Sequence, residues 1–318
     1  MTSTPAQPPI IAIVGPTATG KSALGLAIAE RLGAEVVNAD AMALYRGMDI
    51  GTAKVTLAER RGIPHHQLDV LEPWEEASVA AYQQSARADL AAIADRGHRA
   101  VLVGGSGLYV RAALDALDIP PTDAVVREAL EAELAADGPE PLVARLAAQD
   151  PTAAATIDPR NLRRVVRALE VIALTGRPFS ASMPTRSFVA PTVVLGLSAD
   201  LAILDDRIAS RTATMWARGM TAEVAALRAD SRGLGKTART AIGYAQALAQ
   251  LDGVLTETEA IDATATATRR LVRRQRSWFC PDPRISWLDA DDPSLVEAAL
   301  ATIAAGDAIA GAAGRDNG

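Results

Sequence analysis

The chain has 318 residues, of which 49% are hydrophobic and 22% are charged, and its formal net charge is −6. This composition indicates a globular protein of one large domain or two. One cysteine and three histidines exclude a disulfide framework and a cysteine-rich zinc site, and no apolar run reaches the ~18 residues of a membrane span. The first residues lack the pattern of a signal peptide, so we expect a cytoplasmic protein.

Six short apolar runs predict the strands of a sheet. They are residues 10–15, 34–40, 66–71, 99–105, 192–200 and 284–291. These runs are apolar throughout, as in strands that are covered on both faces. Helical patterns over 21–32, 76–96 and 107–116 lie between them. The alternation predicts an α/β fold in which helices flank a parallel sheet.

The alternation stops after the fourth predicted strand. Residues 118–190 carry helical patterns that are interrupted by proline and glycine. We expect this block to form an inserted helical subdomain, while residues 1–117 and 191–302 form the core domain with its C-terminal helices. Residues 303–318 are small and polar, which predicts a flexible tail.

Residues 15–22 read GPTATGKS and match the phosphate-loop pattern G-x-x-x-x-G-K-[ST], between an apolar run and a helical pattern. Backbone N–H groups and the following helix N-terminus would face a phosphate in such a loop. Lys21 would neutralise phosphate charge, and the Ser22 hydroxyl would ligate Mg²⁺, which prefers oxygen ligands. The residues expected to bind phosphate are Gly15, Thr17, Ala18, Thr19, Gly20, Lys21 and Ser22.

Two aspartates lie at the end of or within apolar runs and could hold Mg²⁺-bound water or accept a proton. Asp40 ends the run after the loop's helix, at the sheet edge where phosphates would lie, and Asp69 lies within the next run, HQLDVL (66–71). Asp40 could instead cap the segment that follows it. The sequence GGSG (104–107) would let a ligand approach the backbone beside the Ser106 hydroxyl, although a plain turn would look the same.

Further motifs follow the phosphate loop along the chain. They are NADAMALYRGMDIGTAK (38–54), PHHQLDVL (64–71), VLVGGSGLYVRAAL (101–114), IDPRNLRRVVRALEVIALTGRPFS (157–180), RTATMWARGMTAEV (211–224), AIGYAQAL (241–248) and ATRRLVRRQRSWF (267–279). Together they resemble the tRNA dimethylallyltransferases, also called isopentenyl-tRNA transferases, over nearly the whole chain. The resemblance is to the bacterial type, because the zinc finger of eukaryotic members has no counterpart in these 318 residues.

The resemblance implies transfer of a dimethylallyl group from dimethylallyl diphosphate to the exocyclic amine of the adenosine 3′ of the anticodon. The acceptor tRNAs would read codons that begin with U. Implied catalytic residues are Asp40 as proton acceptor, Ser106, and Arg211 as the diphosphate-binding arginine, with Arg207 as the alternative. Many relatives have serine where this chain has Ala41. Mg²⁺ would be the cofactor, and the protein would be a monomer.

The resemblance also implies contacts with the tRNA anticodon stem-loop. The residues concerned are Asp40, Ala41, Met42, Ala43, Ser106, Arg127, Arg163, Arg164, Val165, Val166 and Arg167. Arginines also cluster over 269–276, so an acidic body carries two basic stripes that suit RNA phosphates, although charge runs are usually solvated surface. We expect Trp278 and Phe279 to pack in the core rather than to form a base-stacking platform, and His65 and His66 to make ordinary hydrogen bonds rather than to bind a metal.

Two other functions remain open on the sequence alone. The same chemistry on a free adenine nucleotide would need no RNA surface, so the helical block and the basic segments favour tRNA. A phosphate-loop kinase for a small molecule would instead bind ATP with Mg²⁺ and transfer its γ-phosphate.

Overall fold

The computed structural model describes residues 8–182 and 186–316. The chain divides into two compact units. Unit 1 comprises Met1–Leu114 and Phe188–Gly318, and unit 2 comprises Asp115–Ser187. The inserted helical block therefore begins at 115 and ends at 187, where the sequence placed its limits at 118 and 190.

Unit 1 contains a six-stranded parallel sheet with the order β3-β2-β4-β1-β5-β6. The strands are β1 (Ile10–Val14), β2 (Glu35–Asn38), β3 (His65–His66), β4 (Ala100–Gly104), β5 (Thr192–Ser198) and β6 (Ile285–Asp289). Each strand overlaps one of the six apolar runs, so the predicted α/β fold is confirmed. The glycine-rich loop follows β1, which lies between β4 and β5.

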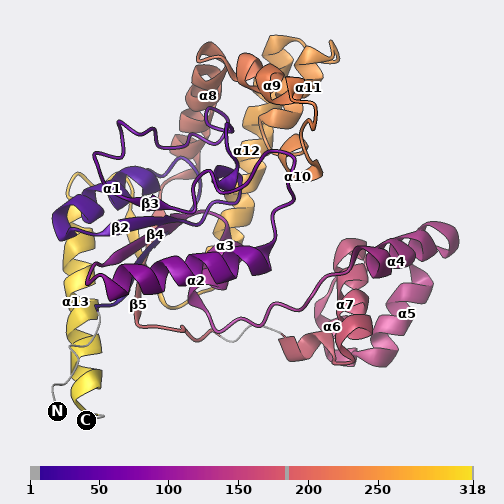
Figure 1. Ribbon diagram of the computed structural model, residues 1–318, viewed down its shortest axis with the longest axis horizontal. Helices are drawn as coiled ribbons and strands as arrows, with labels where there is room; N and C mark the ends of the chain where they lie inside the picture. Colours follow the sequence, from indigo (N-terminus) through magenta and orange to yellow (C-terminus); the bar gives the residue numbers. More distant parts are fainter. Residues whose placement is uncertain (1–7, 183–185, 317–318) are drawn as a thin grey trace. The chain divides into compact units, whose positions relative to one another are not determined.

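Helices cover both faces of this sheet (Figure 1). On one face, α1 (Lys21–Leu32) and α13 (Leu295–Asp316) share a core with side chains of β1, β4 and β5. On the other face lie α2 (Val79–Asp95) and α3 (Gly107–Leu114). The two faces follow from right-handed crossovers, because the chain moves toward the β3 edge of the sheet after β1, through α1, and in the opposite direction after β3, through α2.

The prediction of a flexible tail over 303–318 is wrong as far as residue 316, because α13 extends to Asp316. Ile303 is 2% exposed within the core shared with α1. Gly306 lies so close to β5 that an added Cβ would overlap the side chain of Val193. The small residues that suggested a tail therefore let this helix approach the sheet closely. Residues 317–318 lie outside the described residues.

Further helices of unit 1 follow β5. They are α8 (Leu201–Ala217), α9 (Met220–Ala229), α10 (Lys236–Arg239), α11 (Tyr244–Leu251) and α12 (Glu257–Phe279), and a 3-10 turn (Met42–Leu44) follows β2. Helices α8 and α12 pack side by side (Figure 1). Helices α9 and α11 enclose a separate core around Met48 and Tyr244. No helix in residues 8–182 and 186–316 is both long enough and apolar enough to cross a membrane.

Unit 2 is a small helical unit with its own core. It consists of α4 (Ala124–Asp137), α5 (Glu140–Gln149), α6 (Pro151–Thr156), α7 (Leu162–Thr175) and a 3-10 turn (Phe179–Ser182). Its core includes Leu142, Leu146 and Leu169. The N-termini of α4, α6 and α7 are capped by the side chains of Asp123, Asp150 and Asn161.

A buried carboxylate ties this unit together. The Glu170 side chain is 0% exposed and forms ion pairs of 2.9 Å with Arg127 and 2.8 Å with Arg167. It also accepts a hydrogen bond of 3.0 Å from the backbone N–H of Asp123. Burial alone would raise the pKa of Glu170, but the hydrogen bonds from Arg167 and Arg127 outweigh it and lower that pKa. Glu170 therefore stays charged and connects α4 to α7.

Replacing this carboxylate should loosen unit 2. In Glu170→Ala we expect the amides of α7 to exchange hydrogen about 100-fold faster, equivalent to roughly 3 kcal/mol, the lower end of the range for a broken buried ion pair. The lower end applies because Arg127 and Arg167 are partly exposed and can reach water. Hydrogen-exchange mass spectrometry measures the effect, with α1 as internal reference and Glu133→Ala, at a surface ion pair, as control. Equal exchange in both variants would contradict the structural role of Glu170.

Candidate active site

The carboxyl ends of β1, β4 and β2 lie next to one another in the sheet. The turns that leave these three strands carry GPTATGKS, GGSG and Asp40. A parallel sheet therefore brings together residues that are far apart in the sequence, at the edge where ligands bind in open α/β folds.

The turn after β1 has the geometry of a phosphate loop. Gly15 has φ 133°, and a Cβ on it would lie 2.5 Å from the carbonyl oxygen of Leu197, so only glycine fits there. The Pro16 carbonyl accepts hydrogen bonds from Thr19 Oγ1 at 2.8 Å and from Lys21 Nζ at 2.5 Å. Gly20 caps α1, which leaves the helix N-terminus open to an anion. The described geometry thus fits the predicted role of residues 15–22.

Lys21 shares its surroundings with one negative and one positive group. Burial of its ammonium lowers the pKa of Lys21 from 10.5 to about 8; Asp40 opposes that shift and Arg211 adds to it. Burial also lowers the pKa of Arg211, again against the charge of Asp40. Two cations and one carboxylate therefore interact at this edge, which leaves an excess of positive charge for an anionic ligand.

The structure distinguishes the two candidate arginines on α8. Arg211 donates from Nη1 to Thr17 Oγ1 at 3.2 Å, inside the phosphate loop. Arg207 instead forms an ion pair with Asp291, in the turn after β6. Arg211 is therefore the arginine that faces the loop.

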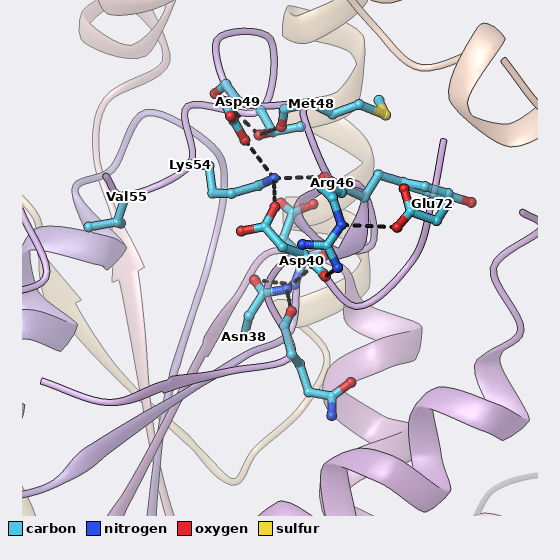
Figure 2. Close-up of polar contacts among 12 residues, drawn as sticks. Asn38, Asp40, Arg46, Met48, Asp49, Lys54, Val55 and Glu72 are labelled. Carbon is cyan, nitrogen blue, oxygen red and sulfur yellow. Dashed lines mark hydrogen bonds and ion pairs between the residues drawn. The ribbon is translucent and has the colours of Figure 1, made fainter. Parts of the chain in front are cut away.

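Asp40 is held by the side chain of Asn38 on one side and by the backbone of Met42 on the other. Its N–H donates to Asn38 Oδ1 at 3.0 Å, and its Oδ1 accepts the N–H of Met42 at 3.0 Å. The Asn38 amide also donates to the Asp40 carbonyl at 2.9 Å, so the two side chains lie together at the end of β2 (Figure 2). Asp40 is thus a cap of the following turn, one of the two predicted roles. The cap uses Oδ1.

Ser106 stands opposite this turn. Its hydroxyl accepts the backbone N–H of Ala41 at 3.2 Å. Because that contact uses the backbone of residue 41, it does not depend on a serine side chain there. The GGSG turn is also tightly packed, since a Cβ on Gly104 would overlap the Ala39 carbonyl.

Two cavities adjoin at these residues. One, of about 320 Å³, is lined by Lys21, Ser22 and Lys54 together with the phosphate loop. The other, of about 560 Å³, is lined by Ser106 and by residues of α8 and α12. Both cavities share the same residues at their junction: Thr17, Ala18, Asp40, Thr52, Gly105 and Arg211. An anion in the first cavity and an acceptor in the second would therefore meet beside Asp40.

One residue that no sequence pattern marks joins two of these turns. Gln275 of α12 is 8% exposed. It accepts the N–H of Thr17 at 2.9 Å through Oε1 and donates from Nε2 to the Gly105 carbonyl at 3.0 Å. Its amide thereby sets the distance between the phosphate loop and the GGSG turn. The only available signal was a glutamine in an arginine-rich segment.

A second missed residue shapes the segment that lines both cavities. Glu223 of α9 accepts the backbone N–H groups of Asp49 at 3.1 Å and Ile50 at 2.7 Å, and the Tyr244 hydroxyl at 2.6 Å. Burial raises the pKa of Tyr244, so its hydroxyl stays a donor. The Glu223 carboxylate therefore holds residues 49–51 against α9 and α11.

Lys54 closes the same segment from its other end. Its ammonium contacts the Tyr45 carbonyl at 2.7 Å, Asp49 at 2.7 Å and Asp69 at 2.6 Å. Figure 2 shows Lys54 pointing toward Asp49. Asp69, the second predicted aspartate, is thus engaged in an ion pair and does not line either cavity. Of the two candidates, Asp40 is the one beside the phosphate loop.

The residues predicted to bind tRNA fall into two groups. Ala41 and Met42 line the 560 Å³ cavity, and Ala43 lines the smaller one. Asp40 and Ser106 line the 560 Å³ cavity as well, and the other residues lie in unit 2: Arg127 in α4, and Arg163, Arg164, Val165, Val166 and Arg167 in α7.

Within unit 2, these residues differ in whether their side chains are exposed and free of ion pairs, and so could contact RNA. Val165 and Val166 are 1% and 4% exposed in its core, so their side chains support this unit, and the predicted tRNA contact of the segment 163–167 stays a prediction. Arg167 pairs with Glu170 and also donates to the Pro120 and Pro121 carbonyls at 2.8 and 2.9 Å. By contrast, Arg163 and Arg164 are exposed and form no ion pair among the described residues.

The two residues at the end of α12 and the two histidines also have different outcomes. Phe279 is 4% exposed and packs as predicted, but Trp278 is 48% exposed, so its predicted core position is wrong. His65 Nδ1 bonds to the Ile63 carbonyl at 2.8 Å, and His66 Nε2 bonds to Glu35 at 2.7 Å, as expected.

The phosphate-loop cavity has the donors that Mg²⁺ prefers. A hydroxyl from Ser22 and a carboxylate from Asp40 line it, and Mg²⁺ takes few protein oxygens when phosphates and waters complete its coordination. The residues present therefore fit Mg²⁺ together with a bound diphosphate.

Comparisons with known proteins place the chain in a family. Residues 43–282 match the family model described as IPP transferase. The chain is 57% identical to a tRNA dimethylallyltransferase of Salinispora arenicola, covering 93% of this chain and 86% of that protein. It is also 57% identical to a tRNA dimethylallyltransferase of Nocardia farcinica, covering 94% and 96%.

Solved structures with a similar fold carry names of the same kind. The tRNA isopentenylpyrophosphate transferase of Bacillus halodurans is 37% identical, with a TM-score of 0.69 over 95% of this chain and 98% of that one. A eukaryotic dimethylallyltransferase acting on tRNA is 27% identical, with a TM-score of 0.78 over 93% of this chain and 77% of that one.

The lowered pKa of Lys21 makes anion binding depend on pH. With a pKa of about 8, Lys21 is partly neutral above that pH in the free protein, and a bound diphosphate should raise the pKa and restore the proton. We therefore expect proton uptake on binding inorganic diphosphate above about pH 8, and an affinity that falls as pH rises. Isothermal titration calorimetry in buffers of different ionisation enthalpy measures the uptake.

Comparison with Lys21→Ala removes the titration of diphosphate itself from this measurement. That variant should bind diphosphate more weakly and show less proton uptake. Lys236→Ala is the matched control, because Lys236 lines neither cavity. Equal proton uptake by Lys21→Ala and the wild type would show that Lys21 does not titrate on binding.

Proposed function

The chain belongs to the IPP transferase family, and on that premise we propose that it transfers a dimethylallyl group from dimethylallyl diphosphate to tRNA. The acceptor is the exocyclic amine of the adenosine 3′ of the anticodon in tRNAs that read codons beginning with U. The product is N6-(dimethylallyl)adenosine, and inorganic diphosphate leaves.

One observation supports this proposal above the others: Asp40 lies where the two cavities adjoin. The amine nitrogen attacks C1 of the dimethylallyl group while the bond from C1 to the diphosphate oxygen breaks. The aromatic amine is a weak nucleophile and must lose a proton as the C–N bond forms. The Asp40 backbone is held by Asn38, and its carboxylate, which accepts the Met42 N–H through Oδ1, would accept that proton.

The leaving group gains negative charge as the bond breaks. Lys21, Arg211 and the N–H groups of the phosphate loop surround the cavity where that charge would develop. Mg²⁺ bound by Ser22 with the diphosphate would supply further charge neutralisation. Since these groups are held in place by the fold, they need little rearrangement during the reaction.

The acceptor side favours RNA over a free nucleotide. The adenosine must leave the stacked anticodon loop to enter the 560 Å³ cavity, at a cost of a few kcal/mol. Arg274 lines that cavity, and Arg270 and Arg273 are exposed on the same helix. None of the three has an ion-pair partner in the described ranges. Such cations can hold the RNA backbone while the base is extruded.

A direct assay tests the function. The purified protein is incubated with dimethylallyl diphosphate, Mg²⁺ and an anticodon stem-loop RNA, and digested nucleosides are analysed by mass spectrometry. We expect N6-(dimethylallyl)adenosine in the RNA. Modification of free AMP with no reaction on RNA would favour the free-nucleotide alternative. Transfer of γ-phosphate from ATP without prenyl transfer would favour a kinase.

Removing the proton acceptor should slow turnover without unfolding the site. In Asp40→Asn, the amide oxygen can still accept the Met42 N–H, so the turn and diphosphate binding should remain. Loss of a general base typically lowers the rate by ~10²–10⁴-fold. Single-turnover kinetics at saturating substrates measures the change. Asp69→Asn is the matched control, because Asp69 lines neither cavity, and it should lose far less. Turnover of Asp40→Asn within a few-fold of wild type would exclude Asp40 as the base.

Exposed arginines of unit 2 should contribute to the salt dependence of RNA affinity. We expect the double variant Arg163→Ala with Arg164→Ala to flatten the slope of log affinity against log salt by about 1–2 units. The double variant Arg145→Ala with Arg160→Ala has the same change in net charge but removes arginines already paired with Glu133 and Asp158. If both double variants changed the slope equally, the effect would come from net charge and not from phosphate contacts at α7.

A further inference from the structure

Trp278 is a large, exposed aromatic side chain at the 560 Å³ cavity, which would receive the acceptor base. It is 48% exposed, whereas its neighbour Phe279 is 4% exposed. It lines the 560 Å³ cavity together with Asp40 and Ser106. The indole offers a large, flat apolar face, and its exposed part borders the cavity that also contains the proposed reacting centre.

The indole is held in place from one side. A Cβ on Gly107 would overlap the ring of Trp278, so the ring lies directly on the first residue of α3. Gly107 follows Ser106, and therefore the ring is fixed relative to the proposed reacting centre. Part of the indole remains open, and the exposed side chain of Leu108 lines the same cavity.

Helix α12 arranges three functions along the cavity wall. Gln275 holds the phosphate loop and the GGSG turn, Arg274 lines the cavity as a cation, and Trp278 lies one turn after Arg274. An aromatic face beside unpaired arginines is the combination that binds single-stranded nucleic acid, because bases stack on the ring and phosphates meet the cations.

We propose that Trp278 is a stacking platform for the nucleobase adjacent to the acceptor adenosine. The proposal rests on the proposed function, since it requires a flipped base beside Asp40. When the acceptor base leaves the stack, its neighbour in the loop loses a stacking partner. The indole replaces that partner, which offsets part of the cost of extrusion and fixes how far the RNA strand enters.

The geometry of the cavity indicates that the base on Trp278 belongs to the nucleotide next to the acceptor adenosine. The acceptor amine must reach Asp40, so the acceptor base fills the part of the cavity near the phosphate loop. The next nucleotide is tied to it by one phosphodiester and lies within reach of another residue of the same cavity wall. Trp278 offers that residue a flat apolar face, and Arg274 offers the intervening phosphate a charge.

Steady-state kinetics on the stem-loop RNA gives the first test. Trp278→Ala should raise the KM for RNA by about 5- to 100-fold, the range that follows from losing a base–aromatic stack. The KM for dimethylallyl diphosphate should stay unchanged, and Trp278→Phe should recover most of the RNA affinity. Trp287→Ala is the matched control: Trp287 is 36% exposed and also packs on a glycine, Gly196, but lines neither cavity.

A double-mutant cycle with abasic RNA separates stacking from a structural role. Stem-loops lacking the base 5′ or 3′ of the acceptor are compared on the wild type and on Trp278→Ala. At one of the two positions, base removal should weaken wild-type binding and have little further effect on the variant. Additive effects at both positions, or an unchanged KM for Trp278→Ala, would overturn the platform.

Two measurements distinguish failure of the proposed function from failure of the stacking platform: dimethylallyl transfer by the wild type, and diphosphate binding by Trp278→Ala. If the wild type transfers no dimethylallyl group to RNA, the proposed function itself fails. If it does, and Trp278→Ala still binds inorganic diphosphate normally, the variant is folded and its RNA kinetics decide the platform. If Trp278→Ala loses diphosphate binding as well, Trp278→Phe with abasic RNA decides: non-additive effects support stacking, and additive effects at both positions overturn it.

Discussion

The charge balance above the carboxyl ends of β1 and β2 is the constraint on which the site depends. Lys21 and Arg211 are two cations held near a single carboxylate, Asp40. Burying these cations is unfavourable in the free protein, which is why the pKa of Lys21 falls to about 8. A bound diphosphate would supply the missing negative charge. The fold therefore holds an excess of buried positive charge, which an anionic ligand would neutralise.

Helix α12 connects the phosphate loop to the larger cavity, where the acceptor would bind. The Gln275 amide bonds to both Thr17 and Gly105, so the turns after β1 and β4 cannot move independently. The same helix carries Arg274 and Trp278 on the wall of the larger cavity. Its start is fixed by the reciprocal bonds of Thr256 and Glu259, and its middle packs on α8. One rigid element thus relates the phosphate loop to the groups that would meet RNA.

Features set by local sequence could be predicted. The apolar runs marked all six strands, most directly the central strands β1 and β4, because strands buried on both faces need apolar side chains at nearly every position. The phosphate loop was recognisable because Gly15 and Lys21 are each required by its geometry. Asp40 could be placed at the same edge, since consecutive crossovers in a parallel sheet return to it. For residues 303–316, small residues suited a tail as well as a closely packed helix.

Features set by distant contacts could not be predicted. Gln275 and Thr17 are 258 positions apart, and Glu223 and Ile50 are 173 apart. A glutamine among arginines, or a glutamate on a helix, gives no local sign of such a partner. Even for the neighbouring residues Trp278 and Phe279, the sequence does not tell which side chain is buried. They are neighbours in sequence, yet the direction of α12 buries one and exposes the other.

The arginines of α7 extend this argument to electrostatics. Arg163 and Arg167 lie one turn apart, and sequence spacing alone makes them equivalent cations. In the structure, Arg167 is bound to Glu170 and to two carbonyl groups, whereas Arg163 is exposed. Glu170 therefore converts part of a basic stripe into internal support for unit 2. A chain with a net charge of −6 can still attract RNA, because affinity depends on the cations that remain unpaired at the surface and not on their total.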